Sequence, residues 1–98
     1  MSRDDVLAIL RQHEAELKHS GIVRLALFGS TARGDNAPNS DVDLLAAFDE
    51  TRRISLLDIA GMELELSNML GCKVDLIEEG TLKPRVQRAV EAEVVRAF

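Results

Sequence analysis

Apolar residues recur at helical spacing in some segments of the chain and at strand spacing in others. Near the N-terminus, Val6, Leu10 and Leu17 fall on one face of a helix, which predicts a helix over residues 4–18. Gly21 follows at the place where a helix commonly ends on a left-handed residue. The chain is therefore expected to begin with a helix that buries one face.

Three shorter apolar segments predict strands, over residues 22–28, 41–48 and 73–77. Successive side chains of a strand point to opposite faces of the sheet, so Val23 and Leu25 are expected to share one face. Each predicted strand is bounded by residues that favour turns or helix ends.

Two capping signals mark where helices begin. Ser2 with Asp5, and Ser55 with Asp58, have the spacing of a capping box, in which each side chain accepts a hydrogen bond from the backbone of the other residue. The second box predicts a helix that ends at Gly71.

A last helix is expected from Pro84 onwards, because proline suits the first turn of a helix. The residues that would form its apolar stripe are Val86, Val90, Val94 and Ala97. The pattern therefore predicts a helix that runs almost to the end of the chain.

The order of these elements predicts the topology of the sheet. A full helix joins the second and third strands, which favours a parallel pair with a right-handed crossover. A short segment joins the first and second strands, which favours an antiparallel pair. We expect an α+β fold of α/β type, with a small mixed sheet of core order 1-2-3 and helices mainly on one face. Residues 1–98 are expected to form one domain.

Carboxylates gather at one edge of this predicted sheet. Asp41 and Asp43 are two residues apart at the start of the second strand, so both side chains point to the same face. Asp75 lies near the start of the parallel third strand and is expected beside them. Gly29 and Ser30 close the antiparallel first strand, so they reach the same edge, where residues 29–34 are expected to form a turn or one helical turn.

Such a group of carboxylates needs positive charge to compensate it, because neighbouring carboxylates repel one another. Mg²⁺ prefers carboxylate oxygens and substrate phosphates, and two such ions can assist an in-line displacement at phosphorus. Asp41 and Asp43 would bind metal and nucleotide together, whereas Asp75 would hold the catalytic metal and accept a proton. Gly29 and Ser30 suit contact with phosphate.

The sequence allows two roles for each of two further polar residues, Arg33 and Ser40. Arg33 either adds positive charge near a triphosphate or pairs with Asp35. Ser40 either binds the nucleotide or caps and positions the loop before the second strand.

Composition narrows the possible functions. The net charge of −5 and the presence of only three aromatic residues argue against nucleic acid as a direct ligand. The single cysteine, Cys72, excludes an internal disulfide and a thiolate metal cluster. The sequence contains neither a membrane-spanning run nor a signal peptide, so the chain is expected in the cytoplasm.

The spacing of the polar motifs resembles a known signature. Gly29-Ser30, positions 31–40 and then Asp41-x-Asp43 resemble the nucleotidyltransferase signature of the polymerase-β-like superfamily. The longer strings LFGSTARGD, NSDVDLLAAF and KVDLIEEGTLKP resemble the minimal nucleotidyltransferases, or MNT proteins. This resemblance covers nearly the whole chain.

The resemblance implies an enzyme that transfers a nucleoside monophosphate from a nucleoside triphosphate to a hydroxyl group, with Mg²⁺ as cofactor. It matches Gly29 and Ser30 to the phosphate-contacting pair, and Asp41, Asp43 and Asp75 to the metal ligands. It also implies a partner, because minimal members often pair with a HEPN protein that acts as an RNase toxin. Some MNT antitoxins adenylylate a tyrosine of that toxin with ATP.

We therefore interpret the chain as a Mg²⁺-dependent nucleotidyltransferase that moves AMP from ATP to a tyrosine of a HEPN toxin, as an antitoxin of type VII kind. One alternative is a binding module that neutralises its partner by forming a complex. Another is a small-molecule nucleotidyltransferase of the antibiotic-modifying kind. RNA tailing is a further alternative, against which the acidic charge argues. The sequence leaves open whether the protein forms homo- or hetero-oligomers.

Overall fold

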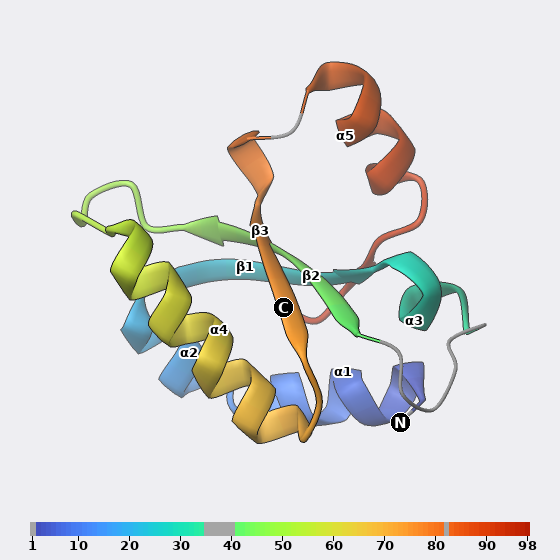
Figure 1. The fold of residues 1–98 in the computed structure, drawn as a ribbon, viewed down its shortest axis with the longest axis horizontal. Coiled ribbons are helices and arrows are strands. Elements are labelled where there is room, and N and C mark those ends of the chain that lie inside the picture. Colours follow the sequence, from blue (N-terminus) through green and yellow to red (C-terminus); the bar gives the residue numbers. More distant parts are fainter. Residues whose placement is uncertain (1, 35–40, 82) are drawn as a thin grey trace.

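The computed structural model describes residues 2–34, 41–81 and 83–98. Helices and strands follow one another in an order close to the predicted one (Figure 1). In chain order the elements are α1 (Arg3–Gln12), α2 (Glu14–Ser20), β1 (Ile22–Phe28), α3 (Gly29–Arg33), β2 (Val42–Phe48), α4 (Leu56–Leu70), β3 (Val74–Glu78), the 3₁₀ turn η1 (Glu79–Thr81), α5 (Pro84–Glu91) and β4 (Val95–Arg96).

The strands form one mixed sheet in the order β3-β2-β1-β4. β1 and β2 pair antiparallel, and β2 and β3 pair parallel with α4 as the crossover between them. The predicted core order 1-2-3 and the predicted strand directions are therefore confirmed. The short strand β4 adds to the free edge of β1 and was not predicted.

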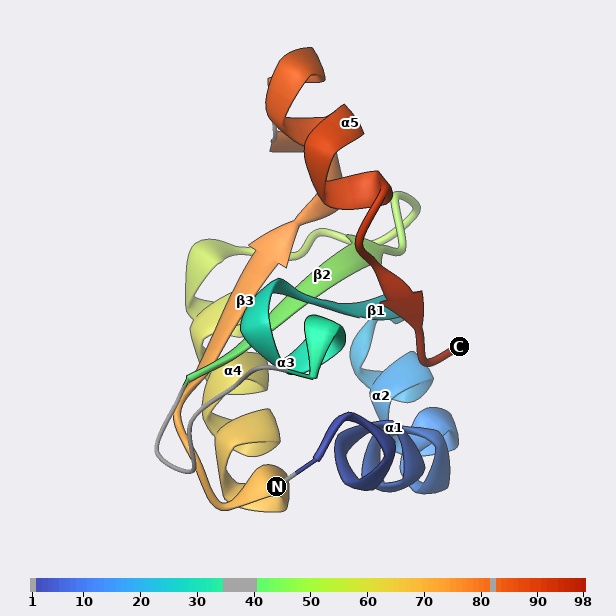
Figure 2. The same cartoon turned by 90° about the vertical axis from the view of Figure 1, so that its right-hand side faces the viewer.

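The helices are distributed unequally over the two faces of the sheet. α1, α2 and α4 lie together on one side of the strands, whereas α5 stands on the opposite side (Figures 1 and 2). The core between the sheet and this layer of helices is aliphatic. Its fully buried larger side chains are Val6, Leu10, Leu17, Ile22, Leu25, Leu27, Leu44, Leu66 and Val74. The prediction of helices mainly on one face is confirmed.

Local signals determine where most helices begin and end. Ser2 with Asp5 and Ser55 with Asp58 form the two predicted capping boxes, with hydrogen bonds in both directions. α4 ends at Gly71, whose φ of 70° lies in the left-handed region that favours glycine. These ends agree with the sequence because caps are made by residues three or four positions apart.

The predicted N-terminal helix is divided in two at His13. The backbone of His13 leaves the helical region, with φ −102° and ψ 15°. Its ring Nδ1 lies 2.9 Å from the carbonyl oxygen of Ile9, so the side chain binds an acceptor of the preceding turn. α2 begins directly after His13 and still buries Leu17 fully.

The prediction of a C-terminal helix is correct for its first half and wrong for its second half. α5 ends at Glu91, and the chain continues as β4. The backbone N–H of Ala97 donates to the carbonyl of Leu25 at 2.9 Å, and the N–H of Leu25 donates to the carbonyl of Phe98 at 3.3 Å. The open edge of β1 offers these hydrogen-bonding groups, and the sequence pattern of residues 92–98 does not reveal that edge.

Across the described ranges, no helix combines the length and the apolar character needed to cross a lipid bilayer.

Candidate active site

Two carboxylates stand side by side on the sheet face that the layer of α1, α2 and α4 does not cover. The parallel register places Asp43 of β2 opposite Asp75 of β3. Their neighbours Val42 and Val74 belong to the buried core, so the two aspartates point to the other face. The predicted juxtaposition of Asp43 and Asp75 is thus present in the structure.

The surroundings of Asp43 disfavour its negative charge. Partial burial raises the pKa of the Asp43 carboxyl, and the negative charges of Asp75 and Asp41 raise it further. A hydrogen bond between the Asp43 and Asp75 side chains acts in the same direction. All three predicted carboxylates therefore interact electrostatically at this edge, and the arrangement favours the binding of positive charge.

Gly29 lies directly against Asp43. It follows β1 with a φ of +75°, and Phe28 just before it is the register partner of Asp43. A Cβ added to Gly29 would lie 2.5 Å from Oδ2 of Asp43. Only glycine fits here, for both the backbone conformation and the space. Ser30 comes next, partly exposed in the short helix α3.

Asp41 lies at the rim of this group. Its side chain is exposed, and its Oδ2 is 3.8 Å from Nζ of Lys73, a residue that precedes β3. Ser40, the other predicted nucleotide-binding residue near this position, lies outside the described residues. Asp41 is therefore close enough to influence Asp43 but is turned toward a lysine.

Arg33 is paired in a way that the sequence did not predict. Its Nη1 donates to Oε2 of Glu93 at 3.0 Å, and both side chains are about half exposed. Glu93 lies in the segment between α5 and β4, far from Arg33 along the chain, so no local signal could have found it. The expected partner Asp35 falls outside the described residues.

Thr31 was missed by the sequence analysis. It follows Ser30 in α3 and is only 1% exposed, and its Oγ1 has no hydrogen-bond partner among the described residues. A buried hydroxyl without a partner costs about 1–3 kcal/mol, which is unusual in a folded protein. No pattern in the sequence distinguishes this threonine from a solvent-exposed one.

The donor chemistry of the site fits a hard divalent cation, which carboxylate oxygens bind well. In the part of the chain that the structure describes, no three acidic, histidine or cysteine side chains stand close enough together to form a ready metal-ligand cluster. Burial raises the pKa of the Asp43 carboxyl, and the negative charges of Asp75 and Asp41 raise it further, so these three aspartates place negative charge close together. Such an excess of charge is what a bound cation would offset.

Comparison with known proteins agrees with this fold. A family model described as a nucleotidyltransferase domain matches residues 10–96. A solved structure described as a minimal nucleotidyltransferase superimposes with a TM-score of 0.81 at 38% identity, and the match covers 97% of this chain and 95% of that one. The chain therefore belongs to the nucleotidyltransferase-domain family and is an enzyme of the nucleotidyltransferase class.

Within that family its relatives are the minimal nucleotidyltransferases. The protein adenylyltransferase MntA of Thermococcus cleftensis is 35% identical over 96 residues, which is 97% of this chain and 95% of the relative. A more distant match is the MNT antitoxin in complex with the tri-AMPylated HEPN toxin of Shewanella oneidensis. It has a TM-score of 0.66 at 14% identity and covers 94% of this chain and 71% of that one. This second likeness shows a shared fold.

Proposed function

We propose that this protein transfers AMP from ATP to a hydroxyl of a partner protein, a tyrosine of a HEPN toxin, and thereby acts as an antitoxin. The observation that carries the proposal is the Asp43–Asp75 pair packed against Gly29 at the end of β1. This group combines acidic metal ligands with a backbone position where no side chain blocks the approach of phosphate.

Each site residue has a role in this reaction. Asp41, Asp43 and Asp75 would hold Mg²⁺, which supplies charge neutralisation on the phosphate oxygens when bound. Gly29 and Ser30 contact the triphosphate through backbone and hydroxyl. The acceptor oxygen attacks the α-phosphorus while the bond from the α-phosphorus to the bridging oxygen breaks, so pyrophosphate leaves. Asp75 accepts the proton of the acceptor hydroxyl.

The relatives support the nature of the transferred group and of the acceptor. One relative at 35% identity is named as a protein adenylyltransferase. The same fold occurs as the antitoxin bound to an AMPylated HEPN toxin. Extending both properties to this chain accounts for its acidic site.

The test is a transfer assay with α-labelled ATP, Mg²⁺, the purified protein and its co-purifying partner. We expect label on the partner, and we expect Asp43→Asn to reduce transfer about a hundredfold or more because a group that stabilises the transition state is lost. Asp4→Asn is the matched control, because Asp4 is a highly exposed aspartate at the start of α1. It should transfer AMP like the wild type.

Two results would contradict the proposal. Transfer at the wild-type rate by Asp43→Asn would show that the site lies elsewhere. If the variant carrying both Asp41→Asn and Asp43→Asn still suppressed the partner, and no label were transferred by the wild type, the protein would neutralise its partner by binding alone.

A further inference from the structure

The outer face of α4 exposes leucines that the fold does not use. Leu57 is 82% exposed and Leu64 is 64% exposed, whereas Met62 and Leu66 on the opposite side of the helix are buried in the core. Helical spacing joins Leu57 and Leu64 into one stripe, with Ala60 and Gly61 between them. We call these four residues the α4 stripe. A surface helix ordinarily has polar residues on its outer side, so a second apolar face indicates contact with another molecule.

Gly61 at the centre of the α4 stripe is not required by the fold of this chain. A Cβ added there would meet nothing within 4 Å, and the backbone is helical. Glycine in the middle of a helix costs about 0.5–1 kcal/mol relative to alanine. The chain itself does not need this glycine, and the missing side chain leaves room for another backbone to approach the helix closely.

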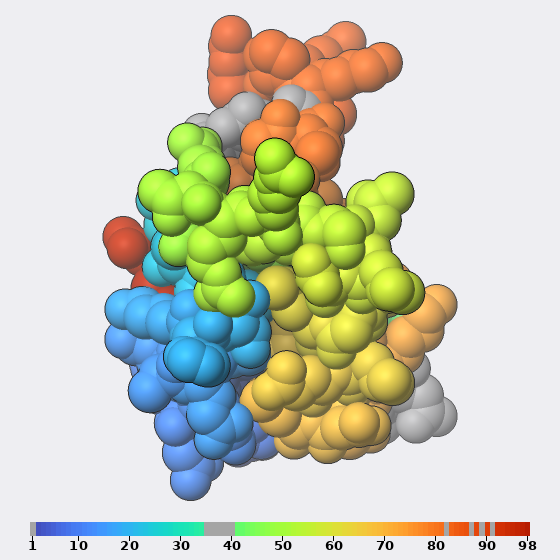
Figure 3. All heavy atoms as spheres, turned by 90° about the vertical axis from the view of Figure 1, so that its left-hand side faces the viewer, coloured from blue at the N-terminus to red at the C-terminus, as the bar shows by residue number. Residues whose placement is uncertain are grey.

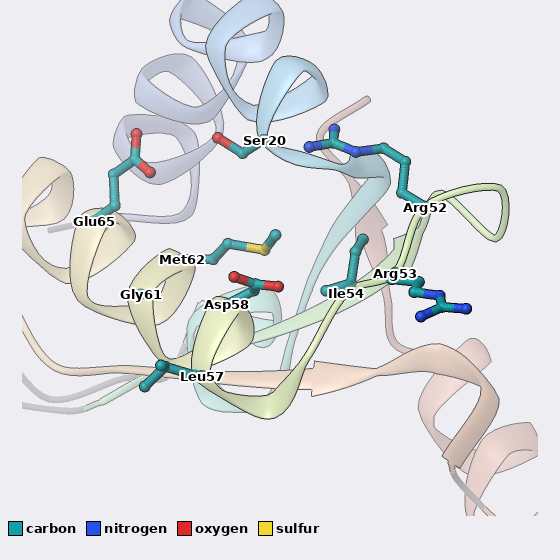
Figure 4. Close-up of a pocket in the computed structure, with 9 residues that line it drawn as sticks. All are labelled: Ser20, Arg52, Arg53, Ile54, Leu57, Asp58, Gly61, Met62 and Glu65. Carbon is teal, nitrogen blue, oxygen red and sulfur yellow. The ribbon is translucent and has the colours of Figure 1, made fainter.

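Unpaired charges flank the α4 stripe at opposite ends. Figure 3 looks onto the face that α2 and α4 form, and Figure 4 shows the hollow of about 380 Å³ beside the stripe. Arg53 lies at one end of this hollow and Glu65 at the other. Among the described residues, neither Arg53 nor the half-buried Glu65 has an ion pair or a side-chain hydrogen bond.

The apolar and the charged residues lie on both sides of one point on α4. Leu57 and Leu64 are equally far from the midpoint between Ala60 and Gly61. Arg53 precedes the first turn of α4, whereas Glu65 lies in its C-terminal half, so the two opposite charges stand on opposite sides of this midpoint. A surface with this arrangement is complementary to itself under a two-fold rotation.

We propose that the α4 stripe binds a second copy of this chain, with the two α4 helices crossing antiparallel at Ala60 and Gly61. Leu57 of each copy then packs against Leu64 of the other, and Arg53 of each copy meets Glu65 of the other. The contact satisfies both unpaired charges and covers the exposed leucines.

The position of α4 also favours a second copy over the substrate protein as the occupant. α4 covers the sheet face opposite to the one that carries Asp43 and Asp75 (Figure 2). A protein that delivers a hydroxyl to those aspartates approaches from the other side. Dimerisation through α4 leaves both catalytic faces open, and it does not depend on the proposed AMP transfer.

The test is the molar mass of the purified full chain, measured by sedimentation velocity over a wide dilution series. We expect a dimer for the wild type and a monomer for Leu64→Glu and for Gly61→Trp, which fills the crossing point. Leu56→Glu is the matched control, because Leu56 is 85% exposed on the same helix but about 100° away from Leu57 around its axis. This variant should stay dimeric.

Charge exchange tests the two-fold arrangement itself. Arg53→Glu and Glu65→Arg should each weaken self-association about tenfold or more, because each brings like charges together. The double variant should restore it. Circular dichroism checks that every variant is folded, and AMP transfer measured in parallel separates failure of the dimer from failure of the proposed function.

The proposal is overturned if the wild type is monomeric at every concentration, or if Leu64→Glu and Gly61→Trp remain dimeric while folded. It is equally overturned if the α4 stripe proves necessary only for binding the substrate protein, because the occupant would then be that protein.

Discussion

Gly29 stands between the end of β1 and the carboxylate of Asp43, where its missing side chain brings two parts of the site together. Its φ of +75° belongs to the region that L-residues rarely adopt, and the space for a Cβ is occupied by Oδ2 of Asp43. Gly71 shares the left-handed backbone, with φ +70°, but a Cβ there would meet nothing within 4 Å. A side chain at either glycine would strain the backbone, but only a side chain at Gly29 would also displace the carboxylate of Asp43. Comparing substitutions at the two positions therefore distinguishes these two effects.

We expect Gly29→Ala and Gly71→Ala to lower the free energy of unfolding by about 1–2 kcal/mol each through backbone strain. Only Gly29→Ala should also reduce AMP transfer, by about tenfold or more, because the new methyl group displaces the Asp43 carboxylate. Urea unfolding measures the first effect and the labelled-ATP assay the second. Equal loss of transfer in both variants would mean that Gly29 acts through stability alone.

Single residues also show where alternation along a strand fails. The alternating pattern placed Val23 on the same face as Leu25, but Val23 is 45% exposed while Ile22 is fully buried. The register of β1 against β2 shifts between Ile22 and Arg24, as a bulge does. The bulge lets two consecutive residues break the alternation, and only the pairing partner determines where it lies.

At the scale of elements, α4 has clear sequence signals at both ends, a capping box at its start and a left-handed glycine after its last residue. The side chain of Ser55 accepts from the backbone N–H of Asp58 at 3.1 Å, and the side chain of Asp58 accepts from the backbone N–H of Ser55 at 2.9 Å. These bonds lower the pKa of the Asp58 carboxyl, chiefly through the backbone N–H of Ser55. Two of the four orphan N–H groups at a helix start are satisfied in this way.

Ser55→Ala should lower the free energy of unfolding by about 1 kcal/mol, because the cap of α4 is lost. A pH dependence should accompany this effect. Because the pKa of Asp58 is lower in the folded protein, its stabilising effect is complete above its unfolded pKa of about 3.9 and is lost as the pH falls through the folded value. Asp58→Asn should therefore lose stability relative to the wild type at neutral pH and approach it in acid. A constant difference in urea midpoints across this range would contradict the assignment.

At the scale of the whole molecule, one side chain ties the first helix to the last strand. Nε of Arg11 donates to the carbonyl of Ala97 at 3.0 Å, and its Nη2 donates to the carbonyl of Arg96 at 3.1 Å. These bonds hold β4 on the edge of β1 from a residue that is distant in sequence. They also join the two ends of the described chain through the layer of helices.

Arg11→Met should lower the free energy of unfolding by about 1–2 kcal/mol, because two carbonyls, of which that of Ala97 is partly buried, lose a charged donor. Arg3→Met is the matched control, since Arg3 makes only a surface contact with Asp4 at 3.7 Å. Its effect should stay within about 0.5 kcal/mol. Urea unfolding of both variants measures the difference. Similar small losses in the two would show that β4 does not depend on Arg11.

The sequence by itself determined what depends on neighbours along the chain. Capping boxes at Ser2 and Ser55, the strand 22–28 and the crossover between β2 and β3 all follow from local spacing, and the structure confirms them. Because parallel strands start at the same edge, the same reasoning placed Asp43 beside Asp75. The roles of these residues in catalysis stay predictions until the transfer assay is done.

Only the tertiary structure decided what depends on contacts between distant segments. Residues 95–96 became a strand because the edge of β1 was open, and Arg33 forms an ion pair with Glu93, which is distant in sequence. Two further features appear only when the sheet and its helices are assembled. Gly29 packs closely against Asp43, and α4 has one apolar face that is buried and another that is exposed. Local sequence patterns specify whether a segment is a helix or a strand and where it ends. Which distant segments pair is decided by the geometry of the assembled fold and by backbone groups that must form hydrogen bonds.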